Sequence, residues 1–179
     1  MAESFIQRYW LMRALYLFLC IFLIFMHLLP LDTQPSNWTG PDLILAITFA
    51  WVLRRPDYVP VLLIALVTLG MDLLFQRPPG LWAACVVMGA ETLRNRAPML
   101  RDLSFAAEWA SVASTMVGIT LAYRLVLAVL MVDQAPLGLS LMQLLFTLAV
   151  YPVVAFVSHT LMGVRKLTPG DLDAMSKRT

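Results

Sequence analysis

The sequence predicts an all-α membrane protein, a bundle of six transmembrane helices with the N and C termini in the cytoplasm. Three observations lead to this fold class. Of the 179 residues, 60% are hydrophobic and 13% are charged, and the mean hydropathy is +0.79. A soluble domain has about 45–50% apolar and about 25% charged residues. The apolar residues gather in six runs, and the basic residues lie almost entirely in alternate connections between those runs.

The six apolar runs define the expected spans and one membrane domain over residues 1–166, followed by a polar cytoplasmic tail at 167–179. The spans fall at about 10–29, 42–53, 59–75, 81–93, 105–132 and 139–164. A hydrocarbon core of about 30 Å needs about 20 apolar residues in a helix. The runs at 42–53 and 81–93 are therefore short for spans, and their limits stay open.

Proline, glycine and aspartate mark where several helices begin or bend. Asp42 follows Pro41 and is placed to be the N-cap or a first-turn acid of the second helix. Pro79 and Gly80 belong to a Pro-Pro-Gly turn that separates the third and fourth runs. Pro152 lies inside the sixth run, where it is expected to kink the helix and free a backbone carbonyl.

The distribution of basic residues fixes the expected topology. One side holds 11 of the 13 basic residues: Arg8, Arg13, Arg54, Arg55, Arg94, Arg96, Arg101, Arg165, Lys166, Lys177 and Arg178. The connections on the other side hold only Arg77, and Arg124 lies within the fifth run. Because short cytoplasmic loops are enriched in Lys and Arg, both termini are predicted to be cytoplasmic. The short runs must then cross, since otherwise a basic connection would fall on the outer side.

Two charges lie inside apolar runs near the outer side. Asp72 is close to the end of the third run, and Arg124 is about eight residues, or roughly 12 Å, from the end of the fifth. Each is costly alone in lipid, so we expect a buried ion pair between them. One alternative is that Asp72 lies near the interface and is solvated by headgroups or by Arg77. Another is that Arg124 extends its side chain outward to the interface, covering apolar surface with its stem.

Other charged groups lie near the inner side. Glu91 and Arg94 are spaced to pair on one helix face. Glu108 and His159 are each about five residues inside their runs, so they can meet across helices. We expect His159 to be a hydrogen-bonded packing residue rather than a proton relay. Arg54 belongs to the basic connection after the second run.

No catalytic constellation is present in the sequence. It contains no HExxH, GxSxG, Walker or CxxC motif. Cys20 and Cys85 lie in apolar runs without metal-ligand spacing and are expected to be small buried hydrophobic residues. We therefore expect no enzymatic activity, no catalytic residue, no metal and no cofactor. Candidate structural or interaction residues are Asp72, Arg124, Pro79, Gly80, Asp42, Arg54, Glu108 and His159.

An ordered set of short motifs across the chain resembles the rod shape-determining protein MreD family. These motifs are Pro41-Asp42-Leu43, Arg54-Arg55-Pro56, Gly70-Met71-Asp72-Leu73-Leu74 and Pro79-Gly80-Leu81. The blocks at 75–82 and 105–109 look most like the alphaproteobacterial branch of the family. The tail beyond Lys166 carries no such motif.

The resemblance implies a role in bacterial cell elongation. MreD is an inner-membrane, non-enzymatic protein that is associated with MreC, and through MreC with RodA, a class B penicillin-binding protein and MreB filaments. Its fold is similar to the substrate-binding S components of energy-coupling factor transporters. The expected surroundings are the lipid bilayer and the MreC transmembrane helix, with no nucleic acid. The alternative is a substrate-binding membrane component of a small-molecule (vitamin-type) transporter.

Overall fold

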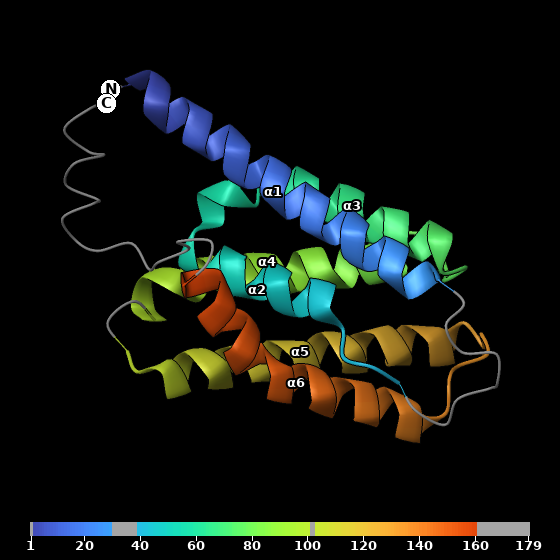
Figure 1. Ribbon diagram of the computed structural model, residues 1–179. Helices are drawn as coiled ribbons and strands as arrows, with labels where there is room; N and C mark the ends of the chain where they lie inside the picture. The colour runs from blue at the N-terminus through green and yellow to red at the C-terminus, as the bar shows by residue number, and fades with distance from the viewer. Residues whose placement is uncertain (1, 30–38, 101–102, 161–179) are drawn as a thin grey trace.

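The computed structural model describes residues 2–29, 39–100 and 103–160, and in these ranges the chain is helical and has no strand. The helices are α1 (Ala2–Leu28), α2 (Leu43–Arg54), the short 3-10 helix η1 (Pro56–Tyr58), α3 (Val61–Leu74), α4 (Leu81–Leu100), α5 (Phe105–Val129) and α6 (Leu137–Thr160) (Figure 1). The predicted all-α fold with six α-helices is thus confirmed for the described ranges. The expected tail, 167–179, and the last part of the sixth run, 161–164, lie outside them.

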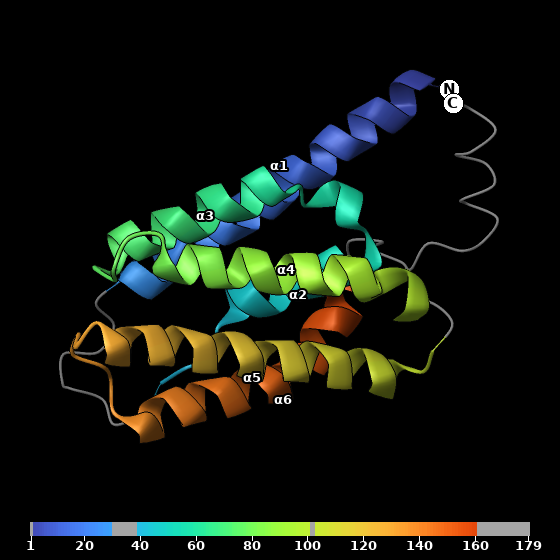
Figure 2. The same ribbon diagram turned by 180° about the vertical axis from the view of Figure 1, so that it is seen from behind.

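The six α-helices run alternately in opposite directions and form three layers (Figures 1 and 2). The helices α1 and α3 form one outer layer, α5 and α6 form the other, and α2 and α4 lie between them. Helix α2 ends at Arg54, and we call this end of the bundle the Arg54 end. The opposite end carries the α3–α4 turn at 75–80 and the α5–α6 connection at 130–136, and we call it the turn end.

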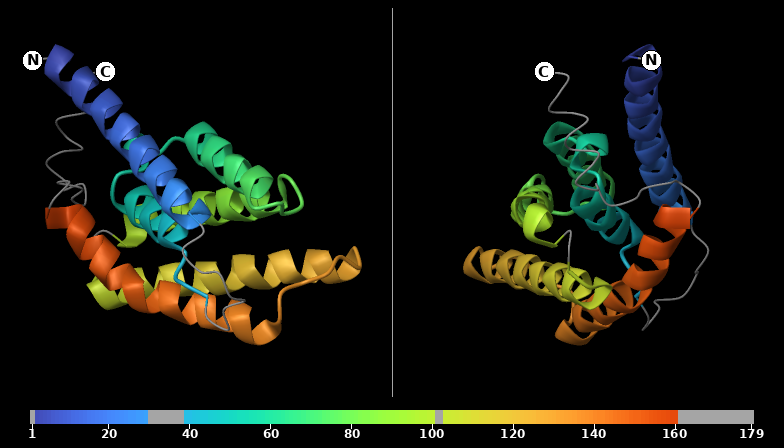
Figure 3. Two further views of the ribbon diagram at one scale, coloured as in Figure 1. Left: turned by 45° about the vertical axis from the view of Figure 1, so that its right-hand side comes forward. Right: turned by 90° about the vertical axis from the view of Figure 1, so that its left-hand side faces the viewer.

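Helix α2 is the centre of the core, between α1 and α6 (Figure 3). Ten of its 12 residues are buried, and Phe49 and Trp51 are fully enclosed. A 2.8 Å hydrogen bond between the hydroxyl groups of Tyr16 and Thr48 attaches α1 to it. Twelve residues span only about 18 Å. Because α2 is surrounded by protein, it does not need the length that a lipid-facing helix requires.

Three segments in the described ranges are long and apolar enough to cross a membrane: Gln7–Leu28, Phe105–Val129 and Leu137–Thr160. The helices Leu43–Arg54 and Val61–Leu74 are apolar but shorter. The outer faces of the long helices carry exposed large apolar side chains, including Phe18 (65% exposed), Leu125 (67%) and Phe156 (67%). Apolar surface of this extent calls for an apolar environment. The fold therefore fits a helical membrane protein.

Helix α4 is longer than the sequence predicts. We expect the fourth helix to end near residue 93, but α4 continues to Leu100. Leu93, Ala97 and Leu100 are all buried, and their spacing of four and three residues keeps one face of the helix against the bundle. Glu91 and Arg94 form the predicted i,i+3 ion pair. The charged stretch is therefore one face of a helix rather than a connection.

Pro152 frees a carbonyl in α6, as predicted. A proline has no N–H to donate to the carbonyl four residues before it, which here belongs to Leu148. The indole N–H of Trp109 on α5 donates to this carbonyl at 3.0 Å. Figure 1 shows α6 bending in its second half. The proline thus provides an acceptor that attaches α5 to α6.

Candidate functional site

A buried ion pair lies at the Arg54 end. Arg54 is 8% exposed, and its Nε atom lies 3.1 Å from Oε1 of the fully buried Glu108 on α5. The Nη1 atom of Arg54 donates to the carbonyl oxygen of Ala155 at 2.7 Å, and the Tyr151 hydroxyl donates to Glu108 Oε1 at 3.1 Å. We call Arg54, Glu108, Tyr151 and Ala155 the Arg54 cluster. Burying an unpaired charge costs several kcal/mol, so the pairing is what makes these charges tolerable.

The Arg54 cluster links α2, α5 and α6, and it differs from the sequence prediction. The sequence allows Glu108 to meet His159, but Glu108 binds Arg54 and Tyr151. His159 is exposed near the end of α6 rather than a packing residue. The inward-facing residue beside it is Ser158, whose hydroxyl oxygen accepts a 3.1 Å hydrogen bond from the indole N–H of Trp51. Helix rotation explains the difference, because α6 turns Ser158 toward α2 and His159 outward.

Asp72 joins the end of α3 to the start of α4. Its side chain is fully buried, and Oδ2 accepts hydrogen bonds from the N–H groups of Gly80 at 3.0 Å and Ala83 at 3.2 Å. Its main-chain carbonyl accepts the N–H of Arg77 at 2.9 Å. The first N–H groups of a helix lack partners within that helix and favour an anion. The backbone of Asp72 therefore closes α3, while its carboxylate caps α4.

The turn between these helices needs two left-handed residues. Gln76 follows the C-cap of α3 with a φ of 53°, and Gly80 precedes α4 with a φ of 85°. Together with the Arg77-to-Asp72 backbone bond, Gln76 completes a Schellman ending. Pro79 is exposed and leads into Gly80. The predicted turn is confirmed, and glycine fits at position 80 because a side chain strains this backbone conformation.

The predicted ion pair between Asp72 and Arg124 is wrong. The Nη1 atom of Arg124 donates to the carbonyl of Ala135 at 3.1 Å and to the hydroxyl of Ser140 at 2.6 Å, and Gln134 Nε2 donates to the carbonyl of Arg124 at 3.1 Å. Arg124 therefore holds the α5–α6 connection against α5. Residue counting places the two charges at similar depth, but Asp72 faces the start of α4 and Arg124 faces α6.

Asp42 caps α2, as predicted. Its Oδ1 atom accepts the N–H of Leu45 at 2.9 Å. Its own N–H donates to the hydroxyl of Thr147 on α6, also at 2.9 Å. Because Thr147 is buried, this bond fixes the start of the central helix against α6.

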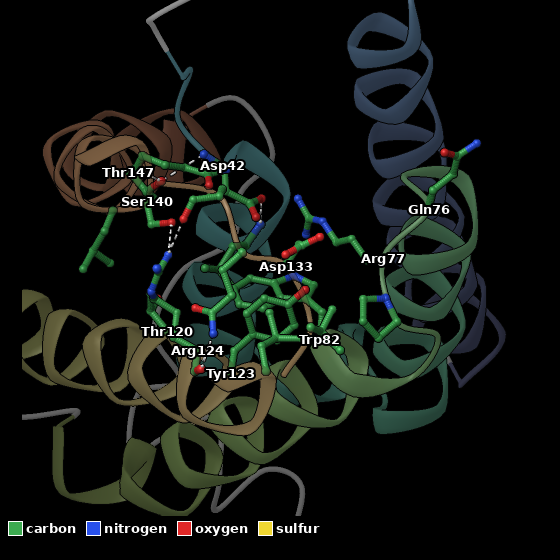
Figure 4. A pocket seen from close by; sticks show the side chains of 18 residues that line it. Asp42, Gln76, Arg77, Trp82, Thr120, Tyr123, Arg124, Asp133, Ser140 and Thr147 are labelled. Atoms are coloured by element: carbon green, nitrogen blue, oxygen red, sulfur yellow. Dashed lines mark hydrogen bonds between the residues drawn. The ribbon is translucent and has the colours of Figure 1, made fainter. Parts of the chain in front are cut away.

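A cavity of about 330 Å³ lies at the turn end (Figure 4). Its walls come from the start of α2, the 75–80 turn, α4, α5, the 130–136 connection and α6. Its polar lining includes Asp42, Arg77, Arg124, Asp133, Ser140 and Thr147. The rings of Trp82 and Tyr123 pack edge to face with their centroids 5.2 Å apart, and they form an aromatic wall of the cavity. The volume lies at the lower end of the range of small-ligand sites, about 300–1,000 Å³.

Two site residues escape the sequence prediction, Arg77 and Tyr151. The Arg77 guanidinium carbon lies 5.5 Å from the ring centroid of Phe75 and 5.7 Å from that of Trp82. The sequence could have indicated Arg77, because it is the one basic residue of the outer connections and has aromatic residues nearby in the chain. For Tyr151, the signal is a phenol inside an apolar run, whose hydroxyl needs a partner when buried.

The described ranges hold no group of three or more His, Cys, Asp or Glu side chains that could bind a metal ion. Cys20 and Cys85 are free and buried, as predicted. The structure thus describes a helical bundle with a buried ion pair at one end and a polar cavity at the other. Comparison with protein-family models, curated proteins and solved structures finds no match. The function is therefore argued from the residues themselves.

Proposed function

We propose that this protein is a non-enzymatic inner-membrane component of the bacterial cell-elongation complex. In this role it binds the transmembrane helix of MreC and helps to regulate peptidoglycan synthesis and cell shape. MreC links it to RodA, a class B penicillin-binding protein and MreB. The proposal rests on the resemblance to the MreD family and on the roles that the resembling residues have in the fold.

The observation that carries the proposal is that each resembling motif builds a helix junction. Asp42 caps α2 and contacts α6 through its N–H. Asp72 closes α3 and caps α4, with Gly80 in the left-handed turn between them. Arg54 anchors the end of α2 to α5 and α6. The resemblance therefore concerns residues that specify this arrangement of helices rather than isolated surface positions.

The proposed topology has six spans with both chain ends in the cytoplasm. Its support is the alternation of the six helices along one bundle axis (Figure 1). Of the eight arginines in the described ranges, Arg77 and Arg124 lie toward the turn end, and the other six lie toward the Arg54 end. The turn end is then periplasmic by the positive-inside rule.

The surface available to a partner helix is apolar. Exposed side chains on α1 include Trp10, Leu11, Phe18, Phe22 and Phe25. Such a face can pack against lipid tails or against another transmembrane helix. A helical partner is therefore compatible with the surface, and the short connections leave no separate extramembrane domain in the described ranges.

Cell shape and co-purification test the proposal. Removing the gene from a rod-shaped host should give round cells, and restoring it should recover rods. MreC should co-purify with the tagged full-length protein from detergent extracts. Normal rods without the gene, together with no retention of MreC, would contradict the proposed role.

One observation favours a second candidate, the substrate-binding membrane component of a small-molecule transporter. The cavity at the turn end has the volume and mixed polar and aromatic lining of a ligand site. Such a component works with an ATPase module. Co-purification with an ATPase, with no change in cell shape when the gene is removed, would favour this candidate over the first.

A further inference from the structure

Arg77 brings a charged group into the cavity, within electrostatic reach of the carboxylates of Asp42 and Asp72. Its side chain makes ring contacts with Phe75 and Trp82, and no ion pair or hydrogen bond of its guanidinium group is found in the described ranges. Figure 4 shows the side chain directed from the turn toward Asp42 and Asp133. A guanidinium group has five N–H donors in a planar fork that matches a carboxylate or phosphate group. These donors are available to a ligand.

The turn fixes the position of Arg77. Its own N–H is bonded to the carbonyl of Asp72, whose carboxylate holds the start of α4. Contacts with the aromatic rings of Phe75 and Trp82 restrict the rotation of its side chain. A donor group that is already oriented loses less conformational entropy when a ligand binds. The junction built by Asp72 therefore also orients the guanidinium group.

The charged groups of the cavity lining differ in how far their hydrogen-bonding capacity is used. Arg77 and Arg124 are both partly buried, and Arg124 uses only its Nη1 atom in the bonds that hold the connection. Asp42 is partly buried but already accepts the N–H of Leu45. Asp133 is exposed, where water and salt screen its charge. The lining thus holds two arginines and two aspartates, and among these groups the guanidinium donors of Arg77 are not taken up by a hydrogen bond within the described residues.

We propose that this cavity binds a small ligand carrying a phosphate or carboxylate group, and that Arg77 binds the anionic group. The aromatic wall of Trp82 and Tyr123 contacts the less polar part of the ligand. A cavity of about 330 Å³ accommodates a small molecule or a lipid headgroup but no folded partner. Ligand binding in this cavity is independent of whether the protein binds MreC.

The anionic group has two sources, a soluble molecule and a membrane lipid. Exposed leucines flank the cavity end of α5 and α6, among them Leu125 (67% exposed) and Leu137 (64%). Because exposed leucines can contact lipid tails, a lipid headgroup can also reach the cavity. Both sources offer the same chemistry to Arg77, so the experiment needs a soluble arm and a lipid arm.

The test measures binding to the purified full-length protein in a neutral detergent. Glycerol 3-phosphate, titrated by calorimetry, is the soluble probe. Phosphatidylglycerol, counted by native mass spectrometry, is the lipid probe. We expect at least one probe to bind, and Arg77→Gln to weaken that binding at least about tenfold, as the loss of a charge-assisted bidentate contact does. Binding of the soluble probe identifies a small-molecule site, and binding of the lipid alone identifies a headgroup site.

The matched control is Arg96→Gln, which removes the same charge from an exposed position at the Arg54 end. It should leave binding unchanged. If Arg77→Gln does not fold, Arg77→Lys serves in its place, because it keeps the charge but loses the planar fork, and it should weaken binding by a smaller factor. The proposal is overturned if neither probe binds the wild-type protein, or if the Arg77 variant and the Arg96 variant bind as well as the wild type.

Discussion

The two ends of the bundle hold their charges in different ways. At the Arg54 end, Arg54 and Glu108 are buried together, and Tyr151 and a backbone carbonyl complete their hydrogen bonds. At the turn end, Asp72 is buried against backbone N–H groups, while Arg77 and Arg124 are partly exposed and line a cavity. The first arrangement uses its polar groups to join three helices. The second leaves donor groups available to a ligand.

This difference separates architecture from binding capacity. A charge pair with each partner buried is costly to break, because the remaining charge has neither water nor counter-ion. A partly exposed arginine such as Arg77, which contacts two aromatic rings, can be changed at a smaller cost. Substitutions at the Arg54 end should therefore change mainly stability, and those at Arg77 mainly binding.

The largest effect is expected for Glu108→Ala. This variant leaves Arg54 buried without its carboxylate, and breaking such a pair costs about 3–5 kcal/mol. The thermal midpoint of the purified protein in detergent should fall by more than for any other variant considered. The matched control is Glu91→Ala, whose side chain is 40% exposed in its pair with Arg94. The control should cost at most about 1 kcal/mol, and equal losses in the two variants would contradict the assignment.

A smaller loss is expected for Asp72→Ala. The variant removes the acceptor of two N–H groups at the start of α4, and the loss of a helix cap costs about 0.5–2 kcal/mol. Asp133→Ala removes an exposed carboxylate at the same end and should change stability by no more than about 0.5 kcal/mol. Chemical denaturation of both variants checks the comparison, and an Asp72 variant as stable as the wild type would show that the cap is unimportant.

The smallest of the three losses is expected for Gly80→Ala. A Cβ at this position meets no atom within 4 Å, so the cost is the left-handed backbone alone, about 1 kcal/mol. Gly118→Ala is the control, because Gly118 lies in α5 with open space around it and alanine favours the helix. The control should be neutral or slightly stabilising. If both substitutions change the thermal midpoint in the same direction, backbone strain at position 80 is not the cause of the loss.

Much of the helix plan can be predicted from local sequence, because helix starts and turns depend on neighbouring residues. Asp42, Gly80 and the pair of Glu91 with Arg94 act within a few positions of themselves, and each is found where the sequence places it. Pro152 likewise acts on a carbonyl four residues away. Such features need no knowledge of how helices pack.

The tertiary partners could not be predicted in the same way. Counting residues along a span gives depth but not the direction in which a side chain points around the helix. Asp72 and Arg124 share a depth and face different neighbours, and Glu108 turns toward α2 rather than toward His159. The sequence places Arg54 in a basic connection, because Arg55 and Pro56 follow it. However, α2 ends one residue later than the apolar run, so Arg54 is part of the helix and lies in the core.

A pair of double-mutant cycles tests the contrast between the two ends most directly. One cycle combines Arg54→Met with Glu108→Leu, and the other combines Asp72→Ala with Arg124→Ala, each followed by the free energy of unfolding in the same detergent. We predict a coupling of at least about 1 kcal/mol for Arg54 with Glu108, so that the double variant is more stable than the sum of the single losses indicates. For Asp72 with Arg124, we predict additive losses within about 0.5 kcal/mol. Additive losses in the first cycle, or strong coupling in the second, would contradict this account.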